Sequence, residues 1–289
     1  MASCPTKTHL FVGVVGAAAL SVGVVGAAVP SATTTKQRVT LGRVRPIVAP
    51  SVAKASFLAL GSELEACAAA GCEWLHCSVQ DGVFVPKVSF GAPVVSAARK
   101  ACPDTVIDVK LGCIDPENRV AEFAAAGADA ISFHPEATKQ PAAVAQKIRD
   151  AGVAPGIVLN PGTAVASVAP LLDIVDLAVV MLVSPGYGGP KYTEIAVEKV
   201  KALRALRPDL HISVDGGVNE KLAPELLRAG ANVLVAGGAI FKADDKKAVV
   251  AELIGNAPHK LQNIPGGLDD HSGPAGSASA FEDDACPDA

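Results

Sequence analysis

Short apolar runs alternate with helix-like segments eight times between residues 45 and 254 of this 289-residue chain. The runs are rich in valine, isoleucine, leucine and alanine, as is typical of parallel strands that are buried on both faces. Strands are expected at 47–50, 74–79, 105–111, 128–133, 155–159, 177–183, 211–214 and 232–235. Eight such strand–helix units predict a single (β/α)8 TIM barrel, an α/β fold.

Four of the intervening segments end in an Ala-Gly pair, at Gly71, Gly127, Gly152 and Gly230. A glycine at this point favours the left-handed conformation that closes a helix. The competing fold is a doubly wound open sheet, whose glycine fingerprint follows its first strand. Here the first strand ends in Ala49-Pro50-Ser51, which favours the barrel. Helices are expected at 62–70, 117–126, 142–151, 193–206 and 221–228.

Glycine-rich turns follow the last three expected strands. Glycine lets the backbone approach an anion, and consecutive N–H groups supply donors to it. Each turn alone could be an ordinary strand-to-helix connection, but three in series predict a phosphate-binding cup. The expected cup residues are Gly186, Tyr187, Gly188, Gly189, Gly216, Gly217, Gly237 and Gly238.

The composition narrows the classes of ligand and partner. The chain is 50% hydrophobic and 4% aromatic and has a formal net charge of −4. It has no basic stripe with interleaved aromatic residues, so nucleic acid is not an expected partner. Seven cysteines without C-x-x-C spacing indicate reduced thiols rather than a disulfide framework.

The two ends of the chain differ from the expected barrel, residues 45–256. Residues 1–44 contain no Asp or Glu, and 10–29 form an uncharged apolar stretch. This pattern predicts a targeting presequence that directs the protein to a plastid, the chloroplast stroma. The presequence resembles a two-part leader, and the mature protein is expected to have no membrane contact. A membrane anchor is the alternative, because the stretch is long enough to span a bilayer. Residues 257–289 are acidic and rich in Gly and Ser, which predicts a disordered tail.

Several motifs at the expected strand ends, in order along the chain, resemble the ribulose-phosphate 3-epimerases. The resemblance runs from about residue 46 to about residue 254, so it covers the whole expected barrel. The motifs are Ala49-Pro50-Ser51, Trp74-Leu75-His76, Asp81-Gly82-Val83-Phe84-Val85-Pro86, Leu159-Asn160-Pro161-Gly162-Thr163, Pro185-Gly186-Tyr187-Gly188-Gly189 and Val214-Asp215-Gly216-Gly217-Val218.

The resemblance implies interconversion of D-ribulose 5-phosphate and D-xylulose 5-phosphate, with the proton at C3 removed on one face and returned on the other. In that family two aspartates and two histidines hold a divalent metal (Zn, Mn, Fe or Mg), which acts as Lewis acid. His76 and Asp215 match one histidine and one aspartate, and Ser51 matches a serine that contacts substrate. Ser78 stands at the second aspartate position and Lys110 at the second histidine position.

These exchanges predict an incomplete, weak or empty metal site at His76 and Asp215. The expected catalytic residues are Asp215, Ser51 and Lys110, the last as an oxyanion partner or only as the counter-ion of Asp215. Because a hydroxyl is no general base, we expect phosphopentose binding with weak or lost epimerase activity. In purely structural roles, Ser51 could be a helix N-cap, and His76 could be a buried histidine whose hydrogen bonds are all made.

Three alternatives stay open at this point. One is an active epimerase with a rebuilt site, and another is a catalytically silent structural or regulatory subunit of a homo-oligomer or larger assembly. The third is a different reaction on the same barrel. Related decarboxylases and aldolases carry D-x-K-x-x-D on strand 3, where this chain has Asp108 and Lys110 but Cys113 in place of the second aspartate.

Overall fold

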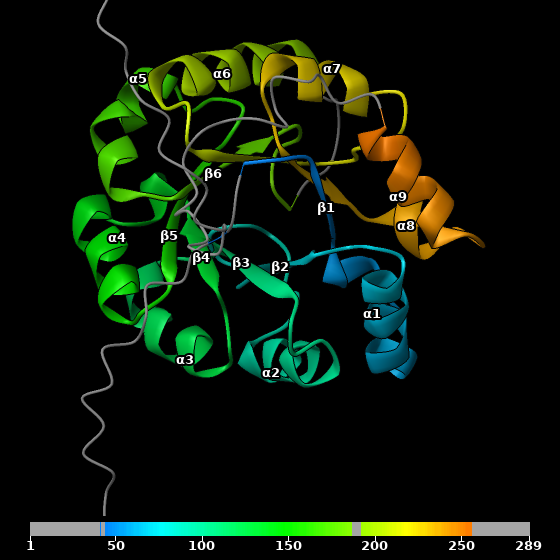
Figure 1. Cartoon of the computed structure of the whole chain (residues 1–289). Coiled ribbons are helices and arrows are strands. Elements are labelled where there is room, and N and C mark those ends of the chain that lie inside the picture. Colours follow the sequence, from blue (N-terminus) through cyan, green and yellow to red (C-terminus); the bar gives the residue numbers. More distant parts are fainter. Residues whose placement is uncertain (1–40, 42–43, 187–191, 256–289) are drawn as a thin grey trace, which may run out of the picture. The chain divides into compact units, whose positions relative to one another are not determined.

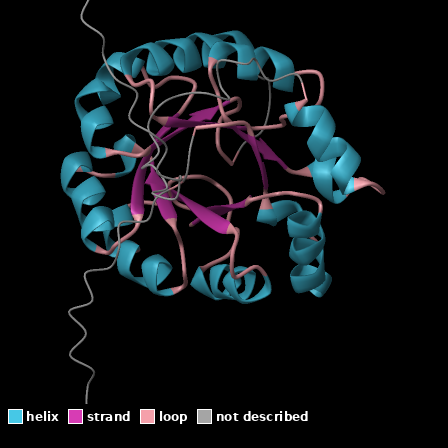
Figure 2. Ribbon diagram, viewed as in Figure 1, coloured by secondary structure: helices cyan, strands magenta, loops and turns pink. Residues whose placement is uncertain are grey.

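The computed structural model describes residue 41 and residues 44–186 and 192–255. Its strands form one eight-stranded parallel sheet in the order β1-β8-β7-β6-β5-β4-β3-β2 (Figures 1 and 2). An additional parallel bridge between Ser51 and His76 joins the two end strands, so the sheet closes into a barrel. The strands are β1 (Ile47–Pro50), β2 (Trp74–Gln80), β3 (Val106–Gly112), β4 (Ala130–Phe133), β5 (Ala154–Leu159), β6 (Leu177–Met181), β7 (His211–Asp215) and β8 (Val233–Ala236).

Helices surround these strands as an outer ring, which Figure 2 shows in cyan around the magenta sheet. The α-helices are α1 (Leu60–Ala69), α2 (Ala92–Ala101), α3 (Val120–Ala125), α4 (Pro141–Asp150), α5 (Val165–Val168), α6 (Thr193–Leu206), α7 (Ala223–Ala229), α8 (Gly238–Phe241) and α9 (Lys246–Ile254). The short 3-10 helices are η1 (Val52–Lys54), η2 (Phe57–Ala59), η3 (Pro116–Asn118), η4 (Pro135–Ala137) and η5 (Ala169–Ile174).

Buried apolar side chains form two sets because each strand is covered on both faces. The larger set packs between the sheet and the helical ring, and includes Phe123, Phe133 and Leu64. The smaller set fills the barrel interior, and includes Trp74 and Leu177. The interior is therefore a packed core below the mouth, and an open pocket can form only where the strands end.

All eight expected strands are confirmed, as is the barrel class, and helix 193–206 is α6 with the same ends. The four Ala-Gly closures are confirmed as well, with glycine φ between 75° and 115°. The expected single helix 117–126 is instead η3 followed by the shorter α3. The segment begins as the 3-10 turn η3 and becomes α-helical only at Val120; such 3-10 turns are common at helix N-termini.

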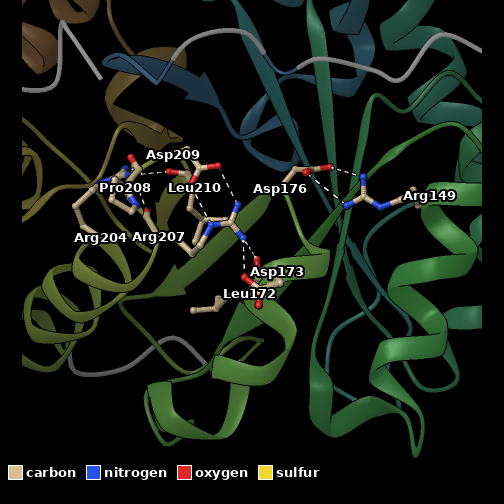
Figure 3. Close-up of polar contacts among 9 residues, drawn as sticks. All are labelled: Arg149, Leu172, Asp173, Asp176, Arg204, Arg207, Pro208, Asp209 and Leu210. Carbon is tan, nitrogen blue, oxygen red and sulfur yellow. Dashed lines mark hydrogen bonds and ion pairs between the residues drawn. The ribbon is translucent and has the colours of Figure 1, made fainter. Parts of the chain in front are cut away.

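Two arginines fasten the end of the barrel where the strands begin. Arg204, in the last turn of α6, donates to the carbonyls of Pro208 (2.8 Å) and Leu210 (2.7 Å) (Figure 3). It also donates to the carbonyl of Gly230 at 2.8 Å. Arg99, in the last turn of α2, donates to the matching carbonyls of the loops before β3 and β4. Each guanidinium thus ties one helix to two strand entries.

Further ion pairs at this end involve Arg149 and Arg207 (Figure 3). The Arg149 guanidinium lies 3.3 Å from Asp176, just before β6, and Arg207 Nε donates to Asp209 at 2.9 Å. Structural charge pairs therefore gather where the strands begin, away from the opposite end, where TIM-barrel sites are built.

The expectations for residues 1–44 and 257–289 fall almost entirely outside the described residues. Within the described part of the chain, no helix combines the length and the apolar character needed to cross a bilayer. The five cysteines of the described part are free thiols, as expected, and all are buried: Cys67, Cys72, Cys77, Cys102 and Cys113.

Candidate active site

Two adjoining cavities open at the carboxyl ends of the strands. The first, of about 350 Å³, is lined from β2, β3, β6 and β7 and includes Ser78, Lys110 and Met181. The second, of about 570 Å³, lies against the glycine turns after β7 and β8. Ser51, Lys54, Val183, Asp215 and Gly216 line both cavities, so one ligand can extend from one into the other.

An ion pair between Lys110 and Asp215 crosses this mouth. Lys110 comes from β3 and Asp215 from the end of β7, and the ammonium donates to Oδ2 of the carboxylate. The same ammonium lies 3.4 Å from the sulfur of Met181. Burial by itself would raise the pKa of Asp215, but Lys110 and then His76 outweigh it and hold that pKa well below its usual range. Asp215 is therefore ionised and already neutralised by a cation.

His76 is fully buried on β2, and both of its ring nitrogens have partners. Nδ1 lies 2.7 Å from Oδ2 of Asp108, and Nε2 lies 3.1 Å from the hydroxyl of Ser78 and 3.6 Å from Oδ2 of Asp215. Burial would lower the pKa of His76, but the carboxylates of Asp108 and Asp215 outweigh it and raise the pKa. An imidazole that tends to be protonated is a hydrogen-bond donor rather than a metal ligand.

The residues at the four cage positions do not fit a divalent metal. His76 Nε2 faces a carboxylate and a hydroxyl, Lys110 brings a positive charge, and Asp215 is bound by that charge. Catalytic zinc sites use three protein ligands as a rule. No cluster of three or more His, Cys, Asp or Glu side chains suited to a metal occurs within residues 44–186 and 192–255. The chemistry inferred for this site therefore involves only the protein's own side chains.

The expected phosphate cup is partly within view. Gly217, Gly237 and Gly238 line the second cavity, Gly186 the first, and Gly216 both. Gly216 has φ +127°, and a Cβ there would lie 3.0 Å from the Cβ of Leu182, so the close turn requires glycine. The remaining cup residues, Tyr187, Gly188 and Gly189, lie outside the described residues.

Ser51 lies at the start of η1, next to the cup. It precedes η1 in the N-cap position, but its side chain makes no capping hydrogen bond. Its backbone N–H donates to the carbonyl of Ala236 at 2.9 Å, which fixes it to the end of β8. The hydroxyl is therefore left available to the cavities that Ser51 lines, in keeping with its expected contact with a ligand.

His134 follows β4 and is buried under the mouth, with its ring 4.9 Å from that of Phe84. Burial, assisted by the charge of Lys110, lowers the pKa of His134 to about 3. This histidine is therefore neutral at physiological pH, and it packs against the loop after β2 rather than exchanging protons.

Sequence reasoning missed three residues of the site. Asp108 orients His76, and its place two residues before Lys110 on the inward face of β3 could have revealed it. Lys54 and Lys87 line the first cavity. Both follow matched motifs closely, Lys54 three residues after Ser51 and Lys87 directly after Pro86, and this position was the available signal.

Known proteins match the part of the chain that forms the barrel. Residues 47–241 match the model described as "Ribulose-phosphate 3 epimerase family". The chain is 42% identical to "Ribulose-5-phosphate-3-epimerase, chloroplastic" of Arabidopsis thaliana, over 69% of this chain and 73% of that protein. It is 39% identical to the "Ribulose-phosphate 3-epimerase" of Bacillus subtilis (strain 168), over 72% of this chain and 98% of that protein.

Solved structures share the barrel at lower identity. The crystal structure of KGPDC from Streptococcus mutans superposes with a TM-score of 0.58 at 17% identity, covering 77% of this chain and all of that one (100%). That of 3-hexulose-6-phosphate synthase gives 0.51 at 21% identity, covering 74% and 98%. These likenesses concern the fold, whereas the family match and the sequence identities decide kinship. The chain belongs to the ribulose-phosphate 3-epimerase family.

Proposed function

We propose that this protein binds a phosphopentose and that its epimerase activity is weak or lost. The observation that carries the proposal is the Lys110–Asp215 ion pair, which puts an ammonium group among the residues that would otherwise hold a metal. The two cavities are lined by Ser51 and by the described cup glycines Gly186, Gly216, Gly217, Gly237 and Gly238, which supports retained binding of a sugar phosphate.

Inversion at C3 needs one group to remove a proton and another to return one on the opposite face. Asp215 can supply one of these groups, although its low pKa makes it a poor base. Ser78 stands where the other carboxylate would act, and its hydroxyl does not exchange protons near pH 7. Loss of one general base costs roughly 10²–10⁴ in rate.

Lys110 gives a specific reason to retain a rebuilt epimerase as second candidate. Its ammonium lies in the first cavity, where it could stabilise an enediolate oxygen while Asp215 moves the proton. The opposite possibility is a catalytically silent subunit, in which the pocket binds the sugar phosphate without converting it. A turnover measurement distinguishes the rebuilt epimerase from the silent subunit.

The test measures D-ribulose 5-phosphate epimerisation by the purified protein with Zn²⁺, Mn²⁺, Fe²⁺ or Mg²⁺. We expect less than about 1% of an ordinary enzymatic turnover of ~10 per second. Turnover near that ordinary value would overturn the proposal and favour a rebuilt site. A rise in Tm with added D-ribulose 5-phosphate, absent in the matched variant Gly237→Asp, is expected if the pocket binds sugar phosphate.

We further propose that residues 1–44 direct the protein to a plastid, that 45–256 form the binding barrel and that 257–289 are a disordered tail. The chloroplastic Arabidopsis relative and the lack of acidic residues in 1–44 support this. A fluorescent protein fused after residue 44 should enter plastids, and one fused to residues 45–289 should not. Retention of the first fusion in a membrane would favour the anchor instead. Assembly as a homo-oligomer, or in a larger complex, is tested by native mass measurement.

A further inference from the structure

The first cavity has a net positive charge. Three lysines line it, Lys54, Lys87 and Lys110, against one acidic residue, Asp215. The Lys110–Asp215 pair cancels internally. Lys54 and Lys87 are left, and within the described residues neither side chain makes a hydrogen bond or an ion pair. Two uncompensated cations in a concave pocket raise the local concentration of anions.

The two free cations belong to different parts of the pocket. Lys54 lines both cavities and packs against Gly237 of the cup, because a Cβ on that glycine would lie 2.7 Å from Cγ of Lys54. Lys87 lines only the first cavity, beside Gln80 and Ser89. One cation therefore borders both cavities, and the other borders only the first.

The loop that carries Lys87 is held in shape before any ligand arrives. Oδ1 of Asp81 accepts the N–H groups of Val83 (2.8 Å) and Phe84 (2.9 Å), and Oδ2 accepts that of Ile114 (2.9 Å). The N–H of Gly82 donates to the carbonyl of Lys87 at 3.1 Å. A preformed loop lowers the entropic cost of ligand binding.

Polar groups surround the position of Lys87. The hydroxyl of Ser89 donates to the carbonyl of Ser78 at 2.8 Å and accepts the N–H of Gln80 at 2.9 Å, which fixes the neighbouring wall. The amide of Gln80 and the ammonium of Lys87 both line the first cavity and can supply hydrogen-bond donors there. The second cavity differs, because Glu220 also lines it and offsets the charge of Lys54 there.

We propose that the pocket prefers a phosphosugar with a second anionic group, a phosphate or a carboxylate, in the first cavity beside Lys87. This inference rests on the proposed phosphosugar binding. The first phosphate lies at the glycine turns of the second cavity beside Lys54, and the second anion is held by Lys87 with Gln80. Lys87 is thus a specificity residue, and Lys54 contributes to the affinity for either ligand.

The experiment measures Kd by calorimetry for three probes on the full chain: D-ribulose 5-phosphate, D-ribulose 1,5-bisphosphate and 6-phosphogluconate. The first has one anionic end, the second has a phosphate at each end, and the third has a carboxylate opposite its phosphate. We expect at least one doubly anionic probe to bind about tenfold more tightly than the first, the usual size of a hydrogen-bonded charge contact. The better of the two identifies the second anion as phosphate or carboxylate.

Variants locate the effect. Lys87→Gln should narrow the tenfold ratio to below about threefold, and Lys54→Gln should weaken binding of all probes. Lys100→Gln is the matched control, because Lys100 is exposed in the last turn of α2, at the end of the barrel where the strands begin. The ratio between the Kd values of D-ribulose 5-phosphate and the better doubly anionic probe should be unchanged in this control. For the wild-type protein, high salt should reduce this ratio.

The outcomes separate this inference from the proposed function. Binding of D-ribulose 5-phosphate with equal or weaker binding of both doubly anionic probes overturns the inference and leaves phosphopentose binding standing. Absence of binding by all three probes overturns both. An undiminished ratio in Lys87→Gln, with Tm unchanged, overturns the assignment of Lys87.

Discussion

Lys110 on β3 donates to the carboxylate of Asp215 on β7, so an ammonium and a carboxylate neutralise each other across the barrel mouth. Met181 of β6 lies 3.4 Å from the same ammonium, and His76 of β2 lies 3.6 Å from the same carboxylate. Four strands therefore meet at one charge pair. The carboxylate of Asp215 is thus retained at the barrel mouth, with the ammonium group of Lys110 as its hydrogen-bond donor.

Replacing Lys110 by methionine should destabilise the fold, because Asp215 would be left without its main counter-ion. Breaking a buried pair of this kind costs about 3 kcal/mol, and the Asp215 side chain is only 15% exposed. The folded-state pKa of Asp215 is depressed, so the stability it contributes is present above its unfolded pKa of about 4 and is lost as pH falls below that. Urea unfolding at pH 7 and pH 3 measures the difference.

The matched control is Lys100→Met, on the surface of α2, for which we expect less than ~0.5 kcal/mol. If Lys110→Met lost the same free energy of unfolding at both pH values, then packing against Met181 rather than charge would be the cause.

Asp108→Asn should lower the pKa of His76. Burial opposes protonation of this histidine, and Asp108 is the main group that overcomes it. Because the folded pKa of His76 is raised, its contribution to stability is present below about pH 6.5 and is lost as pH rises through the folded value. The stability difference between wild type and variant should therefore be larger at pH 6 than at pH 9.

Histidine titration by NMR checks this directly. Ser132→Ala is the control, because Ser132 is buried on the adjacent strand β4, in register with Lys110, and its hydroxyl makes no hydrogen bond within the described residues. If Asp108→Asn left the pKa of His76 unchanged, Asp215 rather than Asp108 would be the group that raises this pKa.

His134→Phe should make the protein less sensitive to acid. Burial keeps His134 neutral with a pKa of about 3, well below its unfolded value of about 6.5, so protonation favours unfolding as pH falls between these values. Wild type should lose about 2 kcal/mol more than the variant between pH 6 and pH 4. Urea unfolding across that range measures it. Phe84→Leu removes the ring contact without a titrating group, and its effect should not depend on pH.

The fold could be predicted from the sequence because its signals are local. Each strand is a short run of β-branched residues, and closures such as Gly71 and Gly230 mark helix ends by backbone conformation alone. The split of 117–126 was missed because a 3-10 turn that opens a helix has no sequence pattern distinct from that of the helix itself.

The site was only partly predictable. His76, Asp215, Ser78 and Lys110 could be placed by resemblance. The structure brings all four together, with Ser78, Lys110 and Asp215 lining the first cavity and His76 buried behind them. The contact of Lys110 with Asp215 joins residues 105 positions apart, so no local pattern reports its geometry. Lys54 and Lys87 escaped notice because a lysine in a loop usually faces solvent, and only the closed barrel shows the cavity beside it.

Arg204→Met should destabilise the barrel by about 3 kcal/mol, because several buried carbonyls would lose their donor. Burial lowers the pKa of Arg204 to about 10, so the side chain still carries its charge at pH 7. Lys201→Met, at an exposed position of the same helix, is the control and should change stability by less than ~0.5 kcal/mol. Thermal unfolding of both variants gives the comparison, and equal effects would show that the Arg204 contacts do not matter.

Restoring Ser78→Asp and Lys110→His together should create a metal site and raise epimerase activity at least ~100-fold. Residues 78 and 110 are paired in register on β2 and β3, so the two new ligands would lie side by side and face His76 and Asp215. The change also frees Asp215 from its ammonium partner. Each single substitution should give little, because Ser78→Asp alone leaves the ammonium in place and Lys110→His alone leaves one acid/base group missing. Zinc titration and turnover of D-ribulose 5-phosphate measure the two gains separately. A double variant that binds zinc at one equivalent but turns over no faster than wild type would show that the decisive loss lies elsewhere in the pocket.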